Sequence, residues 1–179
     1  MTTVGSRTIK HINSLEVSII KVYVLSRNLA TKYCRQTNDN PVAIISISTP
    51  GVEYEESPFI SKKNKVAEIL SLTFRDADCP ETKDVYGYIA HLEDLMSDND
   101  AQKVAEFAER HKDKPIIVHC DAGISRSSAI GAALLRVYNG SDDEIFNSRW
   151  FAPNMWCYYK TLKAFGYDYT PDGVVEVQI

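Results

Sequence analysis

The sequence predicts a single α/β domain, covering residues 1–179, in which a central, largely parallel β-sheet is flanked by helices. Short apolar segments rich in β-branched residues alternate with segments whose apolar residues recur at helical spacing. Residues 41–49 are almost continuously apolar, which is typical of a strand buried on both faces of a parallel sheet. Residues 115–119 predict a strand that leads through a short loop into a helix at 125–138, the kind of junction where α/β proteins bind ligands. No linker or internal repeat divides the chain.

The first half of the chain predicts three strands and one short helix. Residues 17–25 alternate imperfectly and are rich in β-branched residues, so they predict the first strand, with a short helix at 28–35 after it. Residues 41–49 and 67–74 predict the second and third strands. The polar loop at 75–80 then reverses the direction of the chain.

The second half predicts one strand and four helices. A helix begins near residue 98, with Asp100 as its cap, because apolar residues then recur on one helical face. Asn139-Gly140 closes the helix that follows the strand. The order of elements predicts a helical end to the chain. The predicted elements after the helix that begins near residue 98 are a strand at 115–119 and helices at 125–138, 141–150 and 154–165.

Composition restricts the partners of the protein. The formal net charge of -4 argues against nucleic acid or an anionic membrane as the main partner, because both favour a basic surface. The first ten residues lack the apolar run of a signal peptide, and no segment has the length of a membrane span, so we expect a cytoplasmic protein. The four cysteines have no metal-ligand spacing, and we expect four free thiols and no metal site.

The loop between the predicted strand and helix has the form H-C-x-x-G-x-x-R-S, running from His119 to Ser127. Cys120 stands at the end of the strand and faces the N-terminus of the helix, where unpaired N–H groups and the helix dipole create a positive potential. Such surroundings lower the pKa of a thiol from about 8.5 to roughly 3.5–7.5. The spacing therefore predicts that Cys120 is a nucleophile that needs no separate base.

The same loop predicts a phosphate site. Its backbone N–H groups can surround the oxygens of a phosphate dianion, as helix termini and backbone nests do. Gly123 allows a turn with positive φ, and Arg126 supplies a planar fork that binds two phosphate oxygens at once. The residues predicted to bind phosphate are Asp121, Ala122, Gly123, Ile124, Ser125 and Arg126.

Residues near Cys120 are predicted to assist the reaction. His119 is predicted to position the loop, and Ser127 to donate a hydrogen bond to the sulfur of Cys120. A phenolate or alkoxide leaves poorly without a proton, so the chemistry also requires a general acid. The candidates are Asp76 and Asp78 in the loop after the third strand; we favour Asp76 and keep Asp78 as the alternative acid.

These residues resemble the cysteine-dependent protein tyrosine phosphatase superfamily, and within it the dual-specificity phosphatases. The run A-G-I-S-R-S at 122–127 is similar to the loop of the MAP kinase phosphatases and of related small microbial enzymes. Arg149 with P-N at 153–154 resembles the basic stretch and P-N of that group, and F-R-D at 74–76 resembles its acid loop. The matches run from about the third strand to the last helix.

Two departures from the family pattern stand out. The stretch between Asp76 and Cys120 is longer than in compact members and contains an extra segment at 84–96, which leaves the choice of acid open. The tyrosine-recognition motif of the larger tyrosine-specific enzymes is missing, which favours a shallower cleft.

The resemblance implies a protein phosphatase that hydrolyses phosphotyrosine, with phosphoserine and phosphothreonine as further substrates, through a phosphocysteine intermediate and without a cofactor. Its partner is then a phosphorylated protein or peptide; the sequence determines no oligomeric state. One alternative is a catalytically silent module that binds phosphoresidues. Another is a phosphatase for phosphoinositides or RNA 5′ phosphates, although such relatives tend to carry basic residues where this loop has Asp121. Sulfur transfer and arsenate reduction by the same cysteine are further alternatives.

Overall fold

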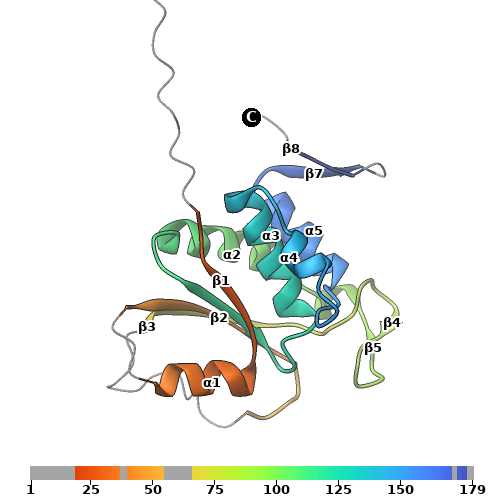
Figure 1. Ribbon diagram of the computed structural model, residues 1–179. Helices are drawn as coiled ribbons and strands as arrows, with labels where there is room; N and C mark the ends of the chain where they lie inside the picture. Colours follow the sequence, from red (N-terminus) through yellow and green to blue (C-terminus); the bar gives the residue numbers. More distant parts are fainter. Residues whose placement is uncertain (1–18, 37–39, 55–65, 171–172, 177–179) are drawn as a thin grey trace, which may run out of the picture.

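The core of the protein is a four-stranded parallel sheet with strand order β1-β6-β2-β3 (Figure 1). The predicted fold class, a central parallel sheet flanked by helices, is confirmed. The computed structural model describes residues 19–36, 40–54, 66–170 and 173–176. The strands of this sheet are β1 (Val22–Ser26), β2 (Val42–Ser48), β3 (Val66–Thr73) and β6 (Ile116–Cys120).

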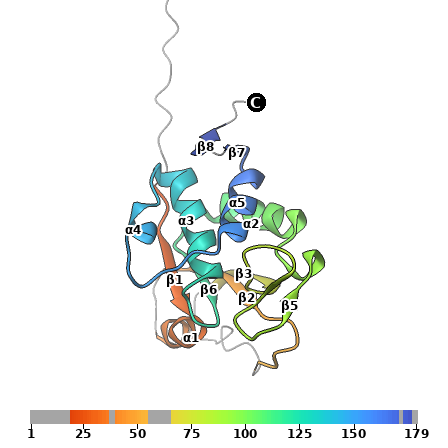
Figure 2. The same ribbon diagram turned by 90° about the vertical axis from the view of Figure 1, so that its right-hand side faces the viewer.

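Helices cover both faces of the sheet, α1 on one face and the others on the opposite face (Figures 1 and 2). The side chains of β2 alternate between these faces. Ile44 belongs to the apolar cluster under α1, whereas Ile45 and Ile47 belong to the larger cluster on the other side. Burial on both faces explains why this strand is almost continuously apolar. The longer helices are α1 (Arg27–Arg35), α2 (Asp98–His111), α3 (Arg126–Asn139) and α5 (Met155–Ala164).

The start of α2 differs from the prediction. Ser97, rather than Asp100, is the N-cap, and its hydroxyl accepts the backbone N–H of Asp100 at 3.1 Å. The Asp100 carboxylate in turn accepts the N–H of Ser97 at 3.1 Å, so the two residues form a capping box. At the end of α3, Gly140 adopts φ 77° in the left-handed region, which confirms the predicted stop.

The first strand is shorter than predicted. It begins at Val22 rather than at residue 17, and residues 17–18 lie outside the described part of the chain. Its five residues pair with the whole of β6, and Ser26 lies opposite Cys120. The parallel pairing thus brings the end of β1 beside the loop that follows β6.

The helix predicted at 141–150 is also wrong in extent, because only α4 (Asp143–Phe146) is helical. The chain after α4 binds the loop that follows β6 instead of continuing the helix. The backbone N–H of Ala152 donates to the carbonyl of Ile124 at 3.0 Å, and that of Asn154 to the carbonyl of Ser125 at 3.3 Å. Pro153, between these two residues, also disfavours a helical backbone at Ala152.

The prediction of a helical end is wrong as well. After α5, Gly166 adopts φ 84° and the chain turns into an antiparallel hairpin. Tyr167 to Thr170 have the sequence Y-D-Y-T, in which aromatic and β-branched residues favour a strand. The hairpin consists of β7 (Tyr167–Thr170) and β8 (Gly173–Glu176).

Within residues 19–36, 40–54, 66–170 and 173–176, no helix combines the length and apolar character needed to cross a bilayer.

Gly131 lets α3 lie directly against β1, and this contact can be tested. A Cβ on residue 131 would lie 2.5 Å from Cγ2 of Val24. Alanine favours a helix over glycine by about 1 kcal/mol, but overpacking typically costs about 1–3 kcal/mol. We expect Gly131→Ala to lower the free energy of unfolding in urea. In a Val24→Ala background the same change should raise it, since the clash is then gone. Stabilisation by Gly131→Ala in the wild-type background would contradict this packing.

Candidate active site

The predicted nucleophile lies at the base of the loop between β6 and α3. Cys120 is the last residue of β6 and is 2% exposed. Its Sγ accepts the backbone N–H of Gly123 at 3.3 Å and lies 3.2 Å from the hydroxyl of Ser127. The loop therefore folds back over the sulfur, with Ser127 in the first turn of α3 beside it.

Hydrogen bonds from neighbouring segments to the carbonyls of the loop fix the orientation of its peptide groups. Because a peptide is planar and trans, an N–H points away from the carbonyl of the residue before it. The N–H groups of Ala122, Ser125 and Arg126 therefore point to the inner side of the loop, where the N–H of Gly123 already meets the sulfur. This arrangement can hold an oxyanion. The anchoring bonds run from the N–H of Arg27 to the carbonyl of Asp121 (3.3 Å), from Ala152 to Ile124 (3.0 Å) and from Asn154 to Ser125 (3.3 Å).

Gly123 is required where the loop passes the end of β1. Its φ is 77°, and a Cβ there would lie 2.4 Å from the backbone N of Ser26 and 2.6 Å from the carbonyl carbon of Leu25. Any side chain would push the loop away from β1. The prediction that this glycine permits a tight turn agrees with both observations.

Arg126 lies under the loop and is 2% exposed. Its Nη1 donates to the carbonyl of Phe74, the residue after β3, at 2.8 Å. The same nitrogen donates to the carbonyl of Ser48, the last residue of β2, at 3.3 Å. Its Nη2 donates to Oδ2 of Asp121 at 2.9 Å. Its Nε faces Oδ2 of Asp76 at 3.6 Å, too far for a hydrogen bond. The sheet thus fixes one edge of the guanidinium, and two carboxylates face the other.

The guanidinium keeps its charge in this buried position. Burial disfavours that charge, but Asp76, Cys120 and Asp121 outweigh the penalty and raise the pKa of Arg126 above its usual value. Positive charge at the site therefore comes from the chain itself. Among the residues that the structure describes, no group of three or more His, Cys, Asp or Glu side chains is arranged to hold a metal ion.

The side chain of Asp121 is surrounded by partners that the sequence did not suggest. Burial favours its neutral form, but hydrogen bonds from Tyr54 and Thr49 and the charge of Arg126 lower the pKa of the carboxyl below its ordinary value. Thr49 Oγ1 donates to its Oδ2 at 2.8 Å. Nε of Arg27 faces its Oδ1 at 3.5 Å. Asp121 was predicted only as a source of backbone N–H, because no spacing links it to these residues.

Asp76 lies directly against the loop. Its Oδ1 accepts the hydroxyl of Ser125 at 2.7 Å and the amide Nδ2 of Asn154 at 3.0 Å. Asn154 also caps α5, where its Oδ1 accepts the N–H of Cys157 at 2.9 Å. The P-N pair at 153–154 was noted only as a resemblance, and the structure gives its asparagine a role: it joins the acid loop to the start of α5.

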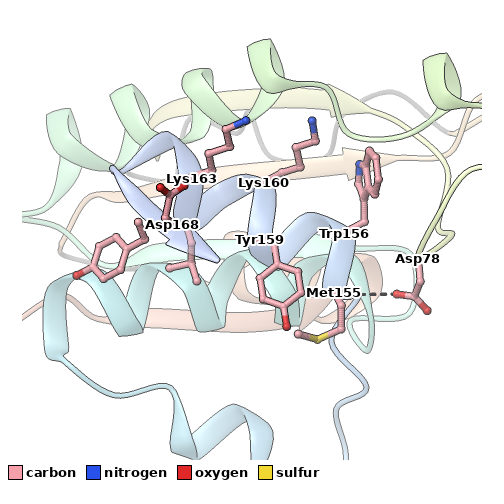
Figure 3. Close-up of a pocket in the computed structure, with 9 residues that line it drawn as sticks. Asp78, Met155, Trp156, Tyr159, Lys160, Lys163 and Asp168 are labelled. Carbon is pink, nitrogen blue, oxygen red and sulfur yellow. Dashed lines mark hydrogen bonds between the residues drawn. The ribbon is translucent and has the colours of Figure 1, made fainter. Parts of the chain in front are cut away.

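Asp78 has a different position. Its carboxylate accepts the N–H of Met155 at 3.1 Å, at the N-terminus of α5 (Figure 3). A negative charge there is favourable because of the helix dipole. It lies at one end of a cavity of about 440 Å³. The other residues lining this cavity are Met155, Trp156, Tyr159, Lys160, Leu162, Lys163, Tyr167 and Asp168.

The extra segment at 84–96 supports the acid loop. The Asp84 side chain is fully buried and pairs with Arg75, the neighbour of Asp76, at 2.9 Å. It also accepts the N–H groups of Tyr86 and Tyr88, each at 2.9 Å. The segment thereby holds the residue before the candidate acid. Its elements are β5 (Ile89–Ala90), which pairs with β4 (Thr82–Lys83), and the 3-10 helix η1 (Leu92–Asp94).

His119 is buried beside Cys120 and is neutral at physiological pH. Burial, followed by the nearby charge of Arg27, lowers the pKa of its imidazole to about 4. Its Nδ1 lies 3.5 Å from the carbonyl of Cys120. The ring is thus buried next to the start of the loop, and its positioning role stays a prediction.

The parallel sheet, with a cysteine loop between β6 and α3 and an arginine at the start of that helix, is the arrangement implied by the resemblance to the cysteine-dependent protein tyrosine phosphatases. The α/β fold that the resemblance implied is confirmed.

Solved structures of phosphatases are similar to the chain. A crystal structure of Tk-PTP in the active form is 18% identical, covers 80% of this chain and 89% of its own, and gives a TM-score of 0.49. PTPMT1 in complex with PI(5)P has the same identity and coverages, with a TM-score of 0.48. Cydia pomonella PTP-2 phosphatase is 14% identical over 87% of this chain and 92% of its own, with a TM-score of 0.47. No family model and no curated protein matches the chain. These likenesses concern the fold, and function is argued from the chain's own residues.

The low pKa of His119 predicts a dependence of stability on pH. An unfolded histidine has a pKa near 6.5 and takes up a proton below it, whereas the folded form stays neutral down to about pH 4. Folding therefore loses stability as the pH falls through this window, by about 2 kcal/mol between pH 7 and pH 5. Urea unfolding of the wild type and His119→Asn at both pH values measures this. The variant should lose about 2 kcal/mol less, and equal losses would disprove the assignment.

Proposed function

We propose that the protein is a cysteine phosphatase that removes phosphate from protein phosphoresidues, with phosphotyrosine as the preferred substrate. The observation that carries this proposal is the contact of the Cys120 sulfur with an inward N–H of its own loop, at 3.3 Å from Gly123. Peptide N–H groups and a guanidinium near the sulfur stabilise it as a thiolate. The same groups can bind the oxyanion whose phosphorus the thiolate attacks.

In the first chemical step the Cys120 sulfur attacks phosphorus and the bond from phosphorus to the leaving oxygen breaks. Asp76 gives its proton to that oxygen, so the product leaves as an alcohol or phenol. Its hydrogen bonds to Ser125 and Asn154 keep Asp76 beside the loop. Arg126 and the loop N–H groups balance the charge of the transferring phosphoryl group.

In the second step water attacks the phosphocysteine. Asp76 takes the proton of the water, the sulfur–phosphorus bond breaks, and inorganic phosphate is released. The sulfur leaves with the bonding electrons, and the hydroxyl of Ser127, 3.2 Å away, can donate a hydrogen bond to it. The cycle regenerates both the thiolate and the protonated acid, and it requires no metal ion.

A polypeptide substrate is favoured by the surroundings of the loop. Ile124 within the loop is 46% exposed, and Trp150, in the segment that binds the loop, is 70% exposed. Exposed apolar side chains beside a site commonly mark a surface that contacts protein. The 2% exposure of Cys120 favours phosphotyrosine, because its phosphate reaches farther from the backbone than that of phosphoserine.

Replacement of the nucleophile tests the proposal. Cys120→Ser should lower kcat on a phosphotyrosine peptide by more than about 10⁴-fold, since a serine hydroxyl lacks the anionic character of a thiolate. Cys79→Ser is the matched control, because Cys79 is a free and exposed thiol outside the loop between β6 and α3, and it should keep full activity. Substantial turnover by Cys120→Ser would reject the phosphocysteine route.

The identity of the acid is tested by pH–rate profiles of Asp76→Asn and Asp78→Asn. Loss of the general acid should lower kcat by roughly 10²- to 10⁴-fold on a phosphotyrosine peptide and remove the decline of rate at high pH. We expect both effects for Asp76→Asn only. An aryl phosphate with a good leaving group should be affected much less, since it needs little protonation. The reverse assignment would follow if only Asp78→Asn lost the basic limb.

A further inference from the structure

The oxyanion-binding edge of Arg126 is already occupied in this structure. The Nε and Nη2 atoms of a guanidinium form the edge that binds two oxygens of a phosphate side by side. In Arg126 the Nη2 donates to Asp121 at 2.9 Å, while Nε has no hydrogen-bond partner among the described residues. The opposite nitrogen, Nη1, is held by two strand carbonyls and is unavailable for phosphate.

Asp121 has a second partner ready beside it. Its Oδ1 faces Nε of Arg27 at 3.5 Å, and neither of these buried atoms has a hydrogen-bond partner among the described residues. Arg27 is itself fixed, because its Nη2 donates to the carbonyl of Ile47 at 3.1 Å and to the hydroxyl of Ser48 at 3.0 Å. A small rotation of the carboxylate toward Arg27 would exchange one guanidinium for the other.

We propose that Asp121 acts as an internal competitor for Arg126: its carboxylate holds the guanidinium in the free protein, and phosphate must displace it toward Arg27. This inference rests on the proposed function, since it concerns the same phosphate site. Asp121 is then a positioning residue that keeps Arg126 oriented between turnovers. It also sets the affinity of the site for oxyanions, because each binding event breaks one buried charge-assisted hydrogen bond.

The competition explains why the arginine is so deeply covered. Arg126 is 2% exposed although it must meet a ligand, and the carboxylate of Asp121 lies on the edge that the ligand would use. Phosphate and carboxylate both carry negative charge, so they cannot share this edge without repulsion. Removal of the carboxylate charge should therefore tighten oxyanion binding.

Calorimetric titration of inorganic phosphate into the full chain tests the exchange. Asp121→Asn should lower the dissociation constant of phosphate by roughly tenfold, the scale of one charge-assisted hydrogen bond that need not be broken. Asp121→Ser, which shortens the side chain, should also tighten binding. Urea unfolding of each variant verifies that it is folded, and either variant alone suffices if the other does not fold.

A control separates direct contact from a general effect of charge. Glu53→Gln removes an exposed carboxylate next to Tyr54, a hydrogen-bond partner of Asp121, without touching Arg126. Long-range attraction is screened at 0.5 M salt, where the Debye length is only about 4 Å. We expect the effect of Asp121→Asn to persist at that salt and the effect of Glu53→Gln to disappear. Unchanged or weaker binding by the Asp121 variants, or an advantage lost in salt, would overturn the inference.

The same titrations distinguish this inference from the proposed function. Phosphate binding that tightens in Asp121→Asn, in a protein without turnover, would uphold the exchange and reject the phosphatase proposal. Normal turnover with no tightening would reject the exchange alone. Absence of phosphate binding in the wild type would reject both.

Discussion

One buried guanidinium connects the sheet, the loop and the candidate acid. Arg126 belongs to the first turn of α3, yet its Nη1 is held by carbonyls at the ends of β2 and β3. The position of the loop is therefore tied to the alignment of two strands far from it in sequence. Because the charge lies in a poorly solvated place, it is stable only while acceptors surround it. Loss of those acceptors would affect the fold and the site together.

Charge balance at the loop follows from this constraint. Two guanidinium groups, those of Arg27 and Arg126, lie near two carboxylates, those of Asp76 and Asp121. The Cys120 thiolate and a dianionic ligand add negative charge to these four balanced charges, so repulsion at Arg126 falls when a carboxylate moves away from it or carries a proton. Each of the two carboxylates can reduce the repulsion in one of these two ways. Asp121 has a neighbouring cation to move to, whereas Asp76 is held in place and is the group that transfers a proton in the proposed reaction.

The loop could be predicted from the sequence because its geometry is local. A strand, a glycine turn and a helix start within nine residues, and the structure confirms each of them. Residues 147–153 could not be predicted in the same way. Pro153 disfavours a helix only at the end of this segment, and the hydrogen bonds of Ala152 and Asn154 to the loop join residues that are distant in the sequence. The partners of Asp121 were missed for the same reason, since Thr49 comes from a distant part of the chain.

The extra segment at 84–96 gives the acid loop a rigid support. Arg75 is bound to Asp84 on one side of the candidate acid, and Asn154 binds the acid itself on the other side. The indole N–H of Trp156 in α5 donates to the carbonyl of Met96 at 2.9 Å, which joins the end of the segment to the same helix. An acid held from both sides keeps its position beside the loop, and proton transfer to the leaving oxygen is sensitive to that position. The insertion thereby orders the loop that carries Asp76.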